Sequence, residues 1–112
     1  MNSISEQKRI SFGYNRGIAN QIELHQGQAA AVRLIYQLYE NGQSLASIAE
    51  RLENINAPSP YNKPKWGRQT LSNILSNPHY LGDEVYPKLI EHEQFEIVQQ
   101  RKKDSAPISV VK

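Results

Sequence analysis

The chain has 112 residues and a net charge of only +2, which is enough for one domain with a modest core and gives no strong overall preference for a partner. The absence of cysteine excludes disulfides and thiolate metal sites and fits a reducing compartment. No apolar run reaches the length of a membrane span, and no secretory leader is recognisable. We therefore expect a cytoplasmic protein with no membrane partner.

The first predicted elements are a hairpin and a long helix. Residues 11–24 have the pattern of a β-hairpin, with a turn-prone cluster at residues 15–17 and alternating polarity after it. Residues 28–40 form the clearest helical pattern, and Asn41-Gly42 supplies a C-terminal stop. The apolar positions of this helix follow i, i+3, i+4, i+7 spacing and are Val32, Ile35, Tyr36 and Tyr39.

Two shorter helices follow, separated by a proline-rich connector. Ser44 is a plausible N-cap for the first of them, whose apolar positions are Leu45, Ile48, Ala49 and Leu52. Residues 57–64 contain three prolines, which fix φ and remove backbone donors, so this connector is predicted to be extended or turned. The next helix is predicted over residues 67–76, with the apolar positions Leu71, Ile74 and Leu75.

The last part of the chain is predicted to contain a strand and a helix. Residues 80–86 have a strand-like pattern that could pair with the early hairpin, and Pro87 ends it. A final helix is predicted to start near Glu91, to bury Phe95 and Val98, and to fray at residues 101–103. These elements predict an α+β fold, with a helix-turn-helix-like core of three helices, a small antiparallel sheet and a C-terminal helix.

Charge is distributed unevenly along the sequence. Residues 54–82 contain no Asp or Glu, although Lys63, Lys65 and Arg68 lie among them. Residues 83–96 carry five acidic side chains against one lysine. One basic and one acidic surface are typical of a module that docks on phosphate by one side, whereas an ordinary mixed surface is the alternative interpretation.

The helix predicted over residues 67–76 has the features of a DNA-recognition helix. Two short helices joined by a connector are a common way for a small domain to enter the major groove. Its polar face lacks carboxylates, and Arg, Gln and Asn side chains can bond base edges. Because such helices read bases mostly from their N-terminal residues, the base-reading candidates are Arg68, Gln69, Thr70 and Asn73. The alternative is a solvated face of a small amphipathic helix.

Other basic and polar residues are candidates for backbone contacts. The phosphate-contact candidates are Lys63, Lys65 and Ser72, with a purely solubilising role as the alternative for the lysines. The candidates for an N-terminal arm beside the minor groove are Lys8, Arg9 and Arg16, with a disordered leader as the alternative. Trp66 is assigned to the core between the second and third helices, with its indole N–H expected to find a partner at the rim.

Catalysis, a metal site and a cofactor are not expected. The three histidines are scattered, and the His-Glu pair at residues 92–93 lacks the second histidine of a metalloprotease helix. No serine stands in a nucleophile-elbow context, and no phosphate-binding glycine loop is present. The sequence therefore indicates a binding module rather than an independent enzyme.

Several short motifs in a fixed order point to a known family. They are Phe12-Gly13-Tyr14, the run 29–36 leading to Tyr39 and Gly42, the run 44–52, then Trp66, Leu71, Ile74-Leu75, Asn77-Pro78 and Tyr80-Leu81-Gly82, and finally Leu89-Ile90 before residues 95–98. This ordered set resembles the recombinase domain of large serine recombinases, which are resolvase/invertase-type site-specific integrases and transposon recombinases. The resemblance covers residues 9–103, flanked by a flexible leader at residues 1–8 and a tail at residues 104–112.

The resemblance implies binding of double-stranded DNA at a recombination half-site by a bacterial or mobile-element protein. In the family a separate N-terminal domain carries the serine that attacks DNA, and a zinc ribbon with a coiled coil often follows. Neither is recognisable here, so we expect an excised domain or a truncated relative, with the catalytic domain of the parent recombinase as a partner and oligomerisation on DNA left open. Two departures concern caps: Asn56 replaces a family glycine after the second helix, and Gly67 replaces a serine before the third.

Two other functions remain alternatives. A helical protein-interaction or regulatory module without DNA contact would show an exposed apolar patch, for which Ile97, Val110 and Val111 are candidates. An independent nuclease or hydrolase is the second alternative.

Overall fold

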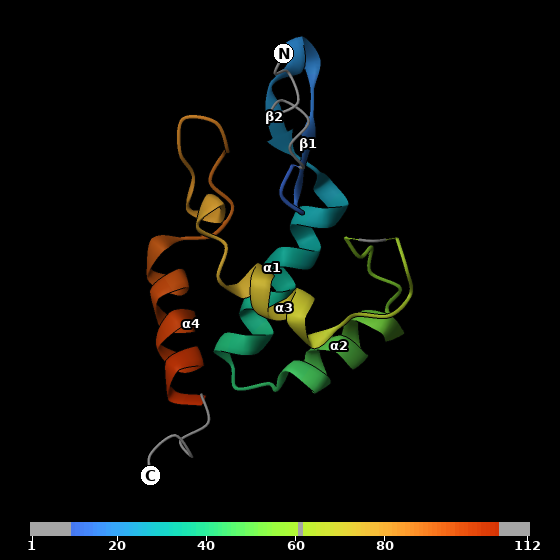
Figure 1. The fold of residues 1–112 in the computed structure, drawn as a ribbon, viewed down its shortest axis with the longest axis vertical. Helices are drawn as coiled ribbons and strands as arrows, with labels where there is room; N and C mark the ends of the chain where they lie inside the picture. The colour runs from blue at the N-terminus through green and yellow to red at the C-terminus, as the bar shows by residue number, and fades with distance from the viewer. Residues whose placement is uncertain (1–9, 61, 106–112) are drawn as a thin grey trace, which may run out of the picture.

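Four α-helices, a two-stranded sheet and two short 3₁₀ helices make up the part of the chain that the computed structural model describes, residues 10–60 and 62–105 (Figure 1). In chain order they are β1 (Tyr14–Arg16), η2 (Ile18–Asn20), β2 (Ile22–Leu24), α1 (Gln26–Glu40), α2 (Leu45–Asn54), α3 (Arg68–Leu75), η3 (Pro78–Leu81) and α4 (His92–Ser105). This arrangement confirms the predicted α+β class. None of the helices within these ranges is long and apolar enough to cross a membrane.

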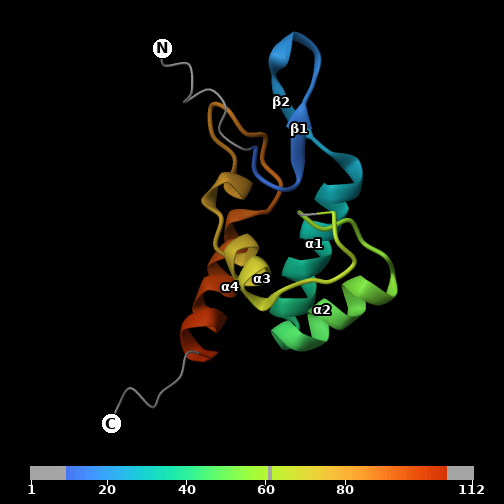
Figure 2. The same ribbon diagram turned by 45° about the vertical axis from the view of Figure 1, so that its right-hand side comes forward.

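The hairpin is confirmed, but its turn lies later than predicted. β1 and β2 pair antiparallel, with Tyr14 opposite Leu24. Residues 15 and 16 belong to β1, and the turn is formed by η2, where Ala19 and Asn20 have φ of 61° and 66°. The Gly17 N–H donates to the Gln21 carbonyl at 2.7 Å and closes this wider loop. The hairpin projects from one end of the molecule, beyond the start of α1 (Figures 1 and 2).

The ends of α1 are set by local caps. The helix starts at Gln26, two residues earlier than predicted, because His25 acts as the N-cap and its Nδ1 accepts from the Gln28 N–H at 3.1 Å. At the other end Gly42 has φ of 102°, and the Gln43 N–H donates to the Leu38 carbonyl at 3.0 Å. This is a Schellman motif, which explains why the Asn-Gly pair stops the helix.

The caps of α2 follow the sequence prediction. The Ser44 Oγ accepts from the Ser47 N–H at 3.0 Å and starts the helix. Asn56 takes the left-handed conformation, with φ of 56°, and the Ala57 N–H donates to the Leu52 carbonyl at 2.9 Å. Asn56 therefore serves as the residue that ends α2, in place of the glycine expected from the family resemblance.

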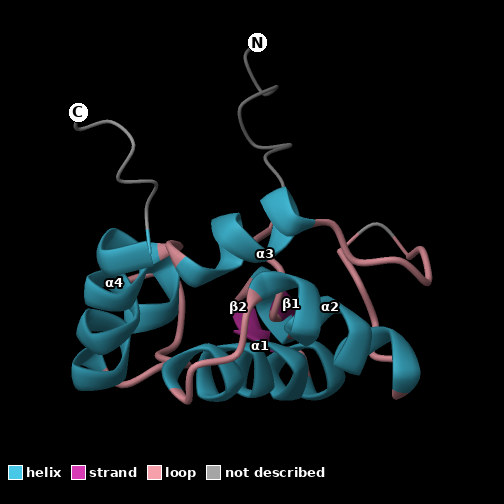
Figure 3. Ribbon diagram, turned by 90° about the horizontal axis from the view of Figure 1, so that it is seen from below, coloured by secondary structure: helices cyan, strands magenta, loops and turns pink. Residues whose placement is uncertain are grey.

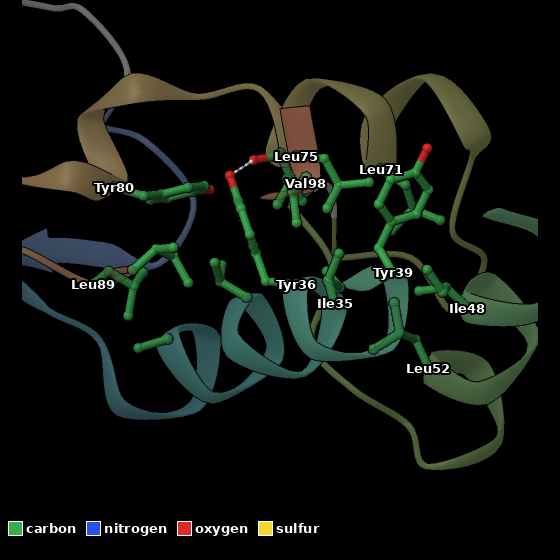
Figure 4. Packing of buried hydrophobic residues seen from close by; sticks show 14 of the residues in the cluster. Ile35, Tyr36, Tyr39, Ile48, Leu52, Leu71, Leu75, Tyr80, Leu89 and Val98 are labelled. Carbon is green, nitrogen blue, oxygen red and sulfur yellow. Dashed lines mark hydrogen bonds between the residues drawn. The ribbon is translucent and has the colours of Figure 1, made fainter. Parts of the chain in front are cut away.

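The core lies between α1 and the three other helices. Figure 3 shows α3 on the side opposite α1, with α2 and α4 flanking them. The Tyr36 hydroxyl of α1 donates to the Ile74 carbonyl of α3 at 2.8 Å, in the middle of the packed side chains (Figure 4). Tyr36 is fully buried, and burial raises the pKa of its phenol well above the ordinary value. The side chains with no exposed surface include Val32, Ile35, Ile48, Leu52, Leu71, Leu75 and Val98.

The strand predicted over residues 80–86 is wrong. The chain forms η3 at residues 78–81 and then a series of bends. Asn77 starts η3, because its Oδ1 accepts from the His79 N–H at 3.0 Å. Local capping by an asparagine before a proline therefore overrides the strand-like alternation that follows.

The segment after η3 turns back on itself instead of pairing with the hairpin. The Tyr80 carbonyl accepts from the Leu89 N–H at 2.8 Å. Within this loop the Asp83 carboxylate accepts from the backbone N–H groups of Val85 at 2.8 Å and Tyr86 at 2.7 Å, and these bonds hold the pKa of Asp83 below its usual value. The backbone donors that a strand would use are thus committed to a local turn.

α4 continues further than predicted. It runs from His92 to Ser105, and Val98 is fully buried in the core, whereas Phe95 is half-buried. The predicted fraying at residues 101–103 is wrong, because Arg101 and Lys102 pack on other helices. The Arg101 guanidinium lies 4.1 Å from the centre of the Tyr39 ring, a cation–π contact.

Candidate nucleic-acid interface

The two faces of α3 have opposite character. Its buried face consists of Leu71, Ile74 and Leu75, none of which is more than 5% exposed. Its outer face carries Arg68, Gln69 and Asn73, which are all exposed, and the Gln69 Nε2 donates to the Asn73 Oδ1 at 2.9 Å. Since α3 lies on the side of the molecule opposite α1, this outer face is turned away from the core (Figure 3).

The other two sequence candidates on α3 lie at its edges. Thr70 is half-buried and, together with Asn73, borders a shallow groove whose further lining residues are Phe12, Pro60, Ile74, Asn77 and Tyr80. Ser72 is also half-buried, but it lies on the side of α4, where its carbonyl and Oγ both accept from the Lys102 ammonium. The structure thus places three of the four base-reading candidates together on α3 and Thr70 beside them.

The connector brings its lysines to the start of α3. Ser59 is buried and fixes the loop: its Oγ donates to the Lys63 carbonyl at 2.7 Å and accepts from the Lys63 N–H at 2.9 Å. The side chains of Lys63 and Lys65 are exposed. The buried Ser59 hydroxyl therefore holds the backbone of this loop, while the ammonium groups of its two lysines remain in solvent.

Trp66 and Glu53 define the entrance to α3. Trp66 is 5% exposed, which confirms its place in the core, and its ring packs edge-on against Phe12 with centroids 5.8 Å apart. The expected partner for its indole N–H is absent within the described part of the chain. Its backbone N–H instead donates to the Glu53 carboxylate at 2.8 Å. This half-buried carboxylate lies near the positive N-terminal end of α3, a favourable position for an anion.

No acidic residue that the structure describes pairs with a side chain on the outer face of α3. The two ion pairs found in the described ranges are Lys88–Glu91 and His92–Glu96, and both involve α4 or the residues just before it. Arg68 makes neither an ion pair nor a side-chain hydrogen bond to any residue placed by the structure. A cation beside amides and hydroxyls, with no competing carboxylate, is a surface suited to phosphate and base edges.

Of the three residues predicted for an N-terminal arm, the structure describes Arg16 alone. Lys8 and Arg9 lie outside the described residues. Arg16 is exposed on β1, and its Nη1 donates to the Asn20 carbonyl within the hairpin turn at 3.0 Å. Because the hairpin projects from one end of the molecule, Arg16 lies apart from α3 (Figures 1 and 2).

The histidines have structural contacts. His25 caps α1, and the His79 Nδ1 lies 2.9 Å from the Ser11 Oγ while its ring stacks on Tyr86. His92 pairs with Glu96 at 3.7 Å within α4. In the residues that could be searched, no three His, Cys, Asp or Glu side chains come together as metal ligands.

Sequence reasoning missed Lys102 as a member of this surface. Its ammonium bridges to α3, although residues 101–103 were expected to fray. A signal was present, because Phe95, Val98 and Lys102 follow i, i+3, i+7 spacing and therefore lie on one face of α4. Lysine stems commonly pack along such a face while the ammonium reaches its edge.

Comparisons with known proteins give the chain a family and structural relatives. The family described as Recombinase matches residues 26–105. A structure from work on the sequence requirements of the Listeria innocua prophage attP site is 26% identical, with a TM-score of 0.67, and the match covers 86% of this chain and 43% of that one. A crystal structure of an LSR–DNA complex shares the fold at 24% identity, with a TM-score of 0.70 and coverage of 94% and 36%. The chain thus spans less than half the length of either protein.

Proposed function

Because the chain belongs to the recombinase family, as a recombinase domain of large serine recombinases, we propose that it binds duplex DNA at one half of a recombination attachment site. In this proposal the chain is the non-catalytic part of a site-specific recombinase. DNA cleavage belongs to the catalytic serine domain of the parent protein, which is also the proposed protein partner. Joining of two or more copies on DNA follows from a site made of two halves.

The outer face of α3 carries the proposal. Arg68, Gln69 and Asn73 are exposed side by side on a short helix, and none of them pairs with a carboxylate in the described ranges. The face opposite is locked into the core by Leu71 and Leu75, which are fully buried. A rigid helix that presents base-bonding side chains is the arrangement that major-groove recognition needs.

The proposed docking places α3 in the major groove and the connector on the backbone. Lys63 and Lys65 are exposed at the entrance of α3 and contact phosphates in this arrangement. Lys8 and Arg9 stay candidates for the minor groove. Arg16 reaches DNA only where the duplex runs along the projecting hairpin.

The first test is the salt dependence of DNA binding. The full 112-residue chain is titrated with a pool of random-sequence duplexes, and with a duplex selected from that pool, at several salt concentrations. We expect log K to fall linearly with log salt concentration, with a slope of roughly −0.9 for each phosphate contacted. Affinity that does not change with salt would contradict the phosphate contacts.

The second test is the base preference of the Arg68→Ala variant. A loss of roughly 1–3 kcal/mol on the selected duplex, with a smaller loss on random duplexes, is expected if Arg68 reads a base. The matched control is Arg33→Ala, which removes an exposed arginine from α1 on the opposite side of the molecule and should leave binding unchanged. Equal losses on both kinds of duplex would assign Arg68 to phosphate contact alone.

A protein-interaction module is the second candidate, and it would show an exposed apolar patch. The exposed apolar side chains of the described residues do not gather in one such patch. Among the described residues, the exposed large apolar side chains are spread over four segments: Ile18 and Leu24 in the hairpin, Ile55 after α2, Val85 in the loop and Ile97 on α4. Val110 and Val111 lie outside the described residues. Size-exclusion chromatography without DNA distinguishes this candidate, and a cleavage assay with divalent metal distinguishes an independent nuclease.

A further inference from the structure

A lysine of α4 is bound to Ser72 of α3 and to Ser76, the C-cap residue of that helix, at the edge of its outer face. The Lys102 Nζ lies 3.1 Å from the Ser72 carbonyl and 3.2 Å from the Ser72 Oγ, and it also contacts the Ser76 Oγ. Ser72 and Ser76 are four residues apart, so their hydroxyls follow one another along the same edge of the helix. One cation and two hydroxyls therefore meet where α3 and α4 join.

The hydrogen-bond inventory of this cluster leaves donors free. An ammonium has three protons, and the three contacts of Lys102 account for all of them. Each serine hydroxyl accepts from the ammonium and still has its own O–H to donate. Neither O–H donates to an acceptor anywhere in the described part of the chain. The cluster thus offers two hydroxyl donors that are polarised by an adjacent positive charge.

Lys102 has no ion-pair partner among the residues that the structure describes. The nearest charged residues along α4, Arg101 and Lys103, are also basic. Partial burial lowers the pKa of Lys102, because desolvation disfavours the charged ammonium. An anion bound here would offset that cost.

We propose that Lys102, Ser72 and Ser76 form a binding site for a phosphate of the DNA backbone, towards the C-terminal end of α3 and so at the other end of the helix from the connector lysines. This site rests on the proposed function and extends it to α4. The two serine hydroxyls donate to the phosphate oxygens, and the ammonium supplies the charge. Ser72 thereby acts in the role predicted from the sequence, but through a partner that the sequence prediction did not include.

The length of α3 is suited to phosphate contacts by lysines near both of its ends. The helix spans eight residues, which at 1.5 Å per residue is about 12 Å. The major groove of B-form DNA is also about 12 Å wide. A helix of this length that lies across the groove has a sugar-phosphate rim close to each end. Lys65 stands at the N-terminal end and Lys102 near the C-terminal end.

A purely structural role for Lys102 makes a different prediction. Lys102 and Gln99 both donate to carbonyls in the last turns of α3, and the Gln99 Nε2 lies 2.6 Å from the Leu75 carbonyl. Such contacts hold a helix end in place and would matter for folding. They do not require that the charge of Lys102 meets DNA, so the salt dependence of binding separates the two roles.

The first experiment uses Lys102→Gln, which removes the charge but keeps amide donors for the α3 carbonyl. Binding of random-sequence duplex to the 112-residue chain is measured between 50 and 200 mM salt. Loss of one phosphate contact should reduce the salt slope by about 0.9, so that the affinity falls about 3.5-fold less over this range than for the unsubstituted chain. Lys88→Gln is the matched control, because Lys88 is paired with Glu91 at 3.0 Å, and its slope should not change.

A second measurement needs no substitution and therefore does not depend on how well the variant folds. The chain is treated with an amine-acylating reagent with and without duplex DNA, and modified lysines are identified by mass spectrometry. Duplex should protect Lys102 but not Lys88. If the unsubstituted chain does not bind duplex at all, the proposed function fails. If it binds with salt dependence, yet Lys102→Gln has the same slope and duplex leaves Lys102 equally reactive, only the phosphate site is wrong.

Discussion

The buried face and the outer face of α3 differ in solvent exposure, in polarity and in the residues that they contact. Leu71 and Leu75 are fully buried against α1, whereas Arg68 and Gln69 on the same short helix are exposed and have no acidic partner in the described ranges. The buried face fixes the position of the helix, and the outer face is left available for a ligand. Folding and binding should therefore respond to different substitutions within eight residues.

The largest expected effect comes from a cavity on the buried face. Leu71→Ala removes a side chain with no exposed surface and should lower the free energy of unfolding by roughly 2–5 kcal/mol. Chemical denaturation followed by circular dichroism measures this loss. Asn73→Ala, on the outer face of the same helix, should change it by less than about 0.5 kcal/mol. Similar losses in the free energy of unfolding for the two variants would contradict the view that only the buried face of α3 supports folding.

An intermediate effect is expected at alkaline pH, and it concerns three buried tyrosines of the core rather than the outer face of α3. Burial raises the pKa of Tyr14 to about 12 and also raises the pKa of Tyr36 and Tyr80. Above pH 10 the unfolded chain releases these phenol protons while the folded chain retains them, so stability is lost as pH rises. Each such tyrosine contributes a loss of about 1.4 kcal/mol per pH unit.

Denaturation midpoints between pH 9 and 12 test this pH dependence. Tyr36→Phe removes one of the retained protons and should make the decline shallower, although it also removes the hydrogen bond to the Ile74 carbonyl. A stability that is constant up to pH 12 would contradict the burial of these phenols.

The smallest expected effect is that of a single phosphate contact on the connector. Lys65→Ala should weaken binding to all duplexes alike and reduce the salt slope by about 0.9, with no change in base preference. Its free energy of unfolding should stay within about 0.5 kcal/mol, because the side chain is exposed. Parallel binding titrations on selected and random duplexes provide the measurement. A change in base preference would contradict this prediction and would show that Lys65 contacts base edges in the groove instead of phosphate.

The sequence predicted the helices well because their signals are local. Apolar spacing located α1, α2 and α3, and the caps at Ser44 and Asn56 act as their residue types suggest. The polar residues of α3 were identified as exposed for the same reason, since a helix that buries Leu71 and Leu75 must expose the opposite side. The binding roles of these residues stay predictions.

The features that the sequence did not predict depend on contacts between distant segments. The segment 80–86 alternates like a strand, yet the carbonyl of Tyr80 is taken by a backbone donor beyond the loop. The Glu53 carboxylate meets the backbone of Trp66, thirteen positions later, and Lys102 meets Ser72 across the α3–α4 junction. The apolar spacing of α4 indicates which of its faces carries Lys102, but the residues that these side chains meet are set by the packing of whole helices.

Chemical-shift mapping by NMR tests whether the outer face of α3 lies against duplex DNA. Amide signals of the 112-residue chain are compared with and without a selected duplex. The largest changes are expected at Arg68, Gln69 and Asn73 and at the connector lysines, with the buried face of α1 unaffected. Changes confined to the acidic first turns of α4, or to the hairpin, with α3 unperturbed, would contradict this position of the DNA.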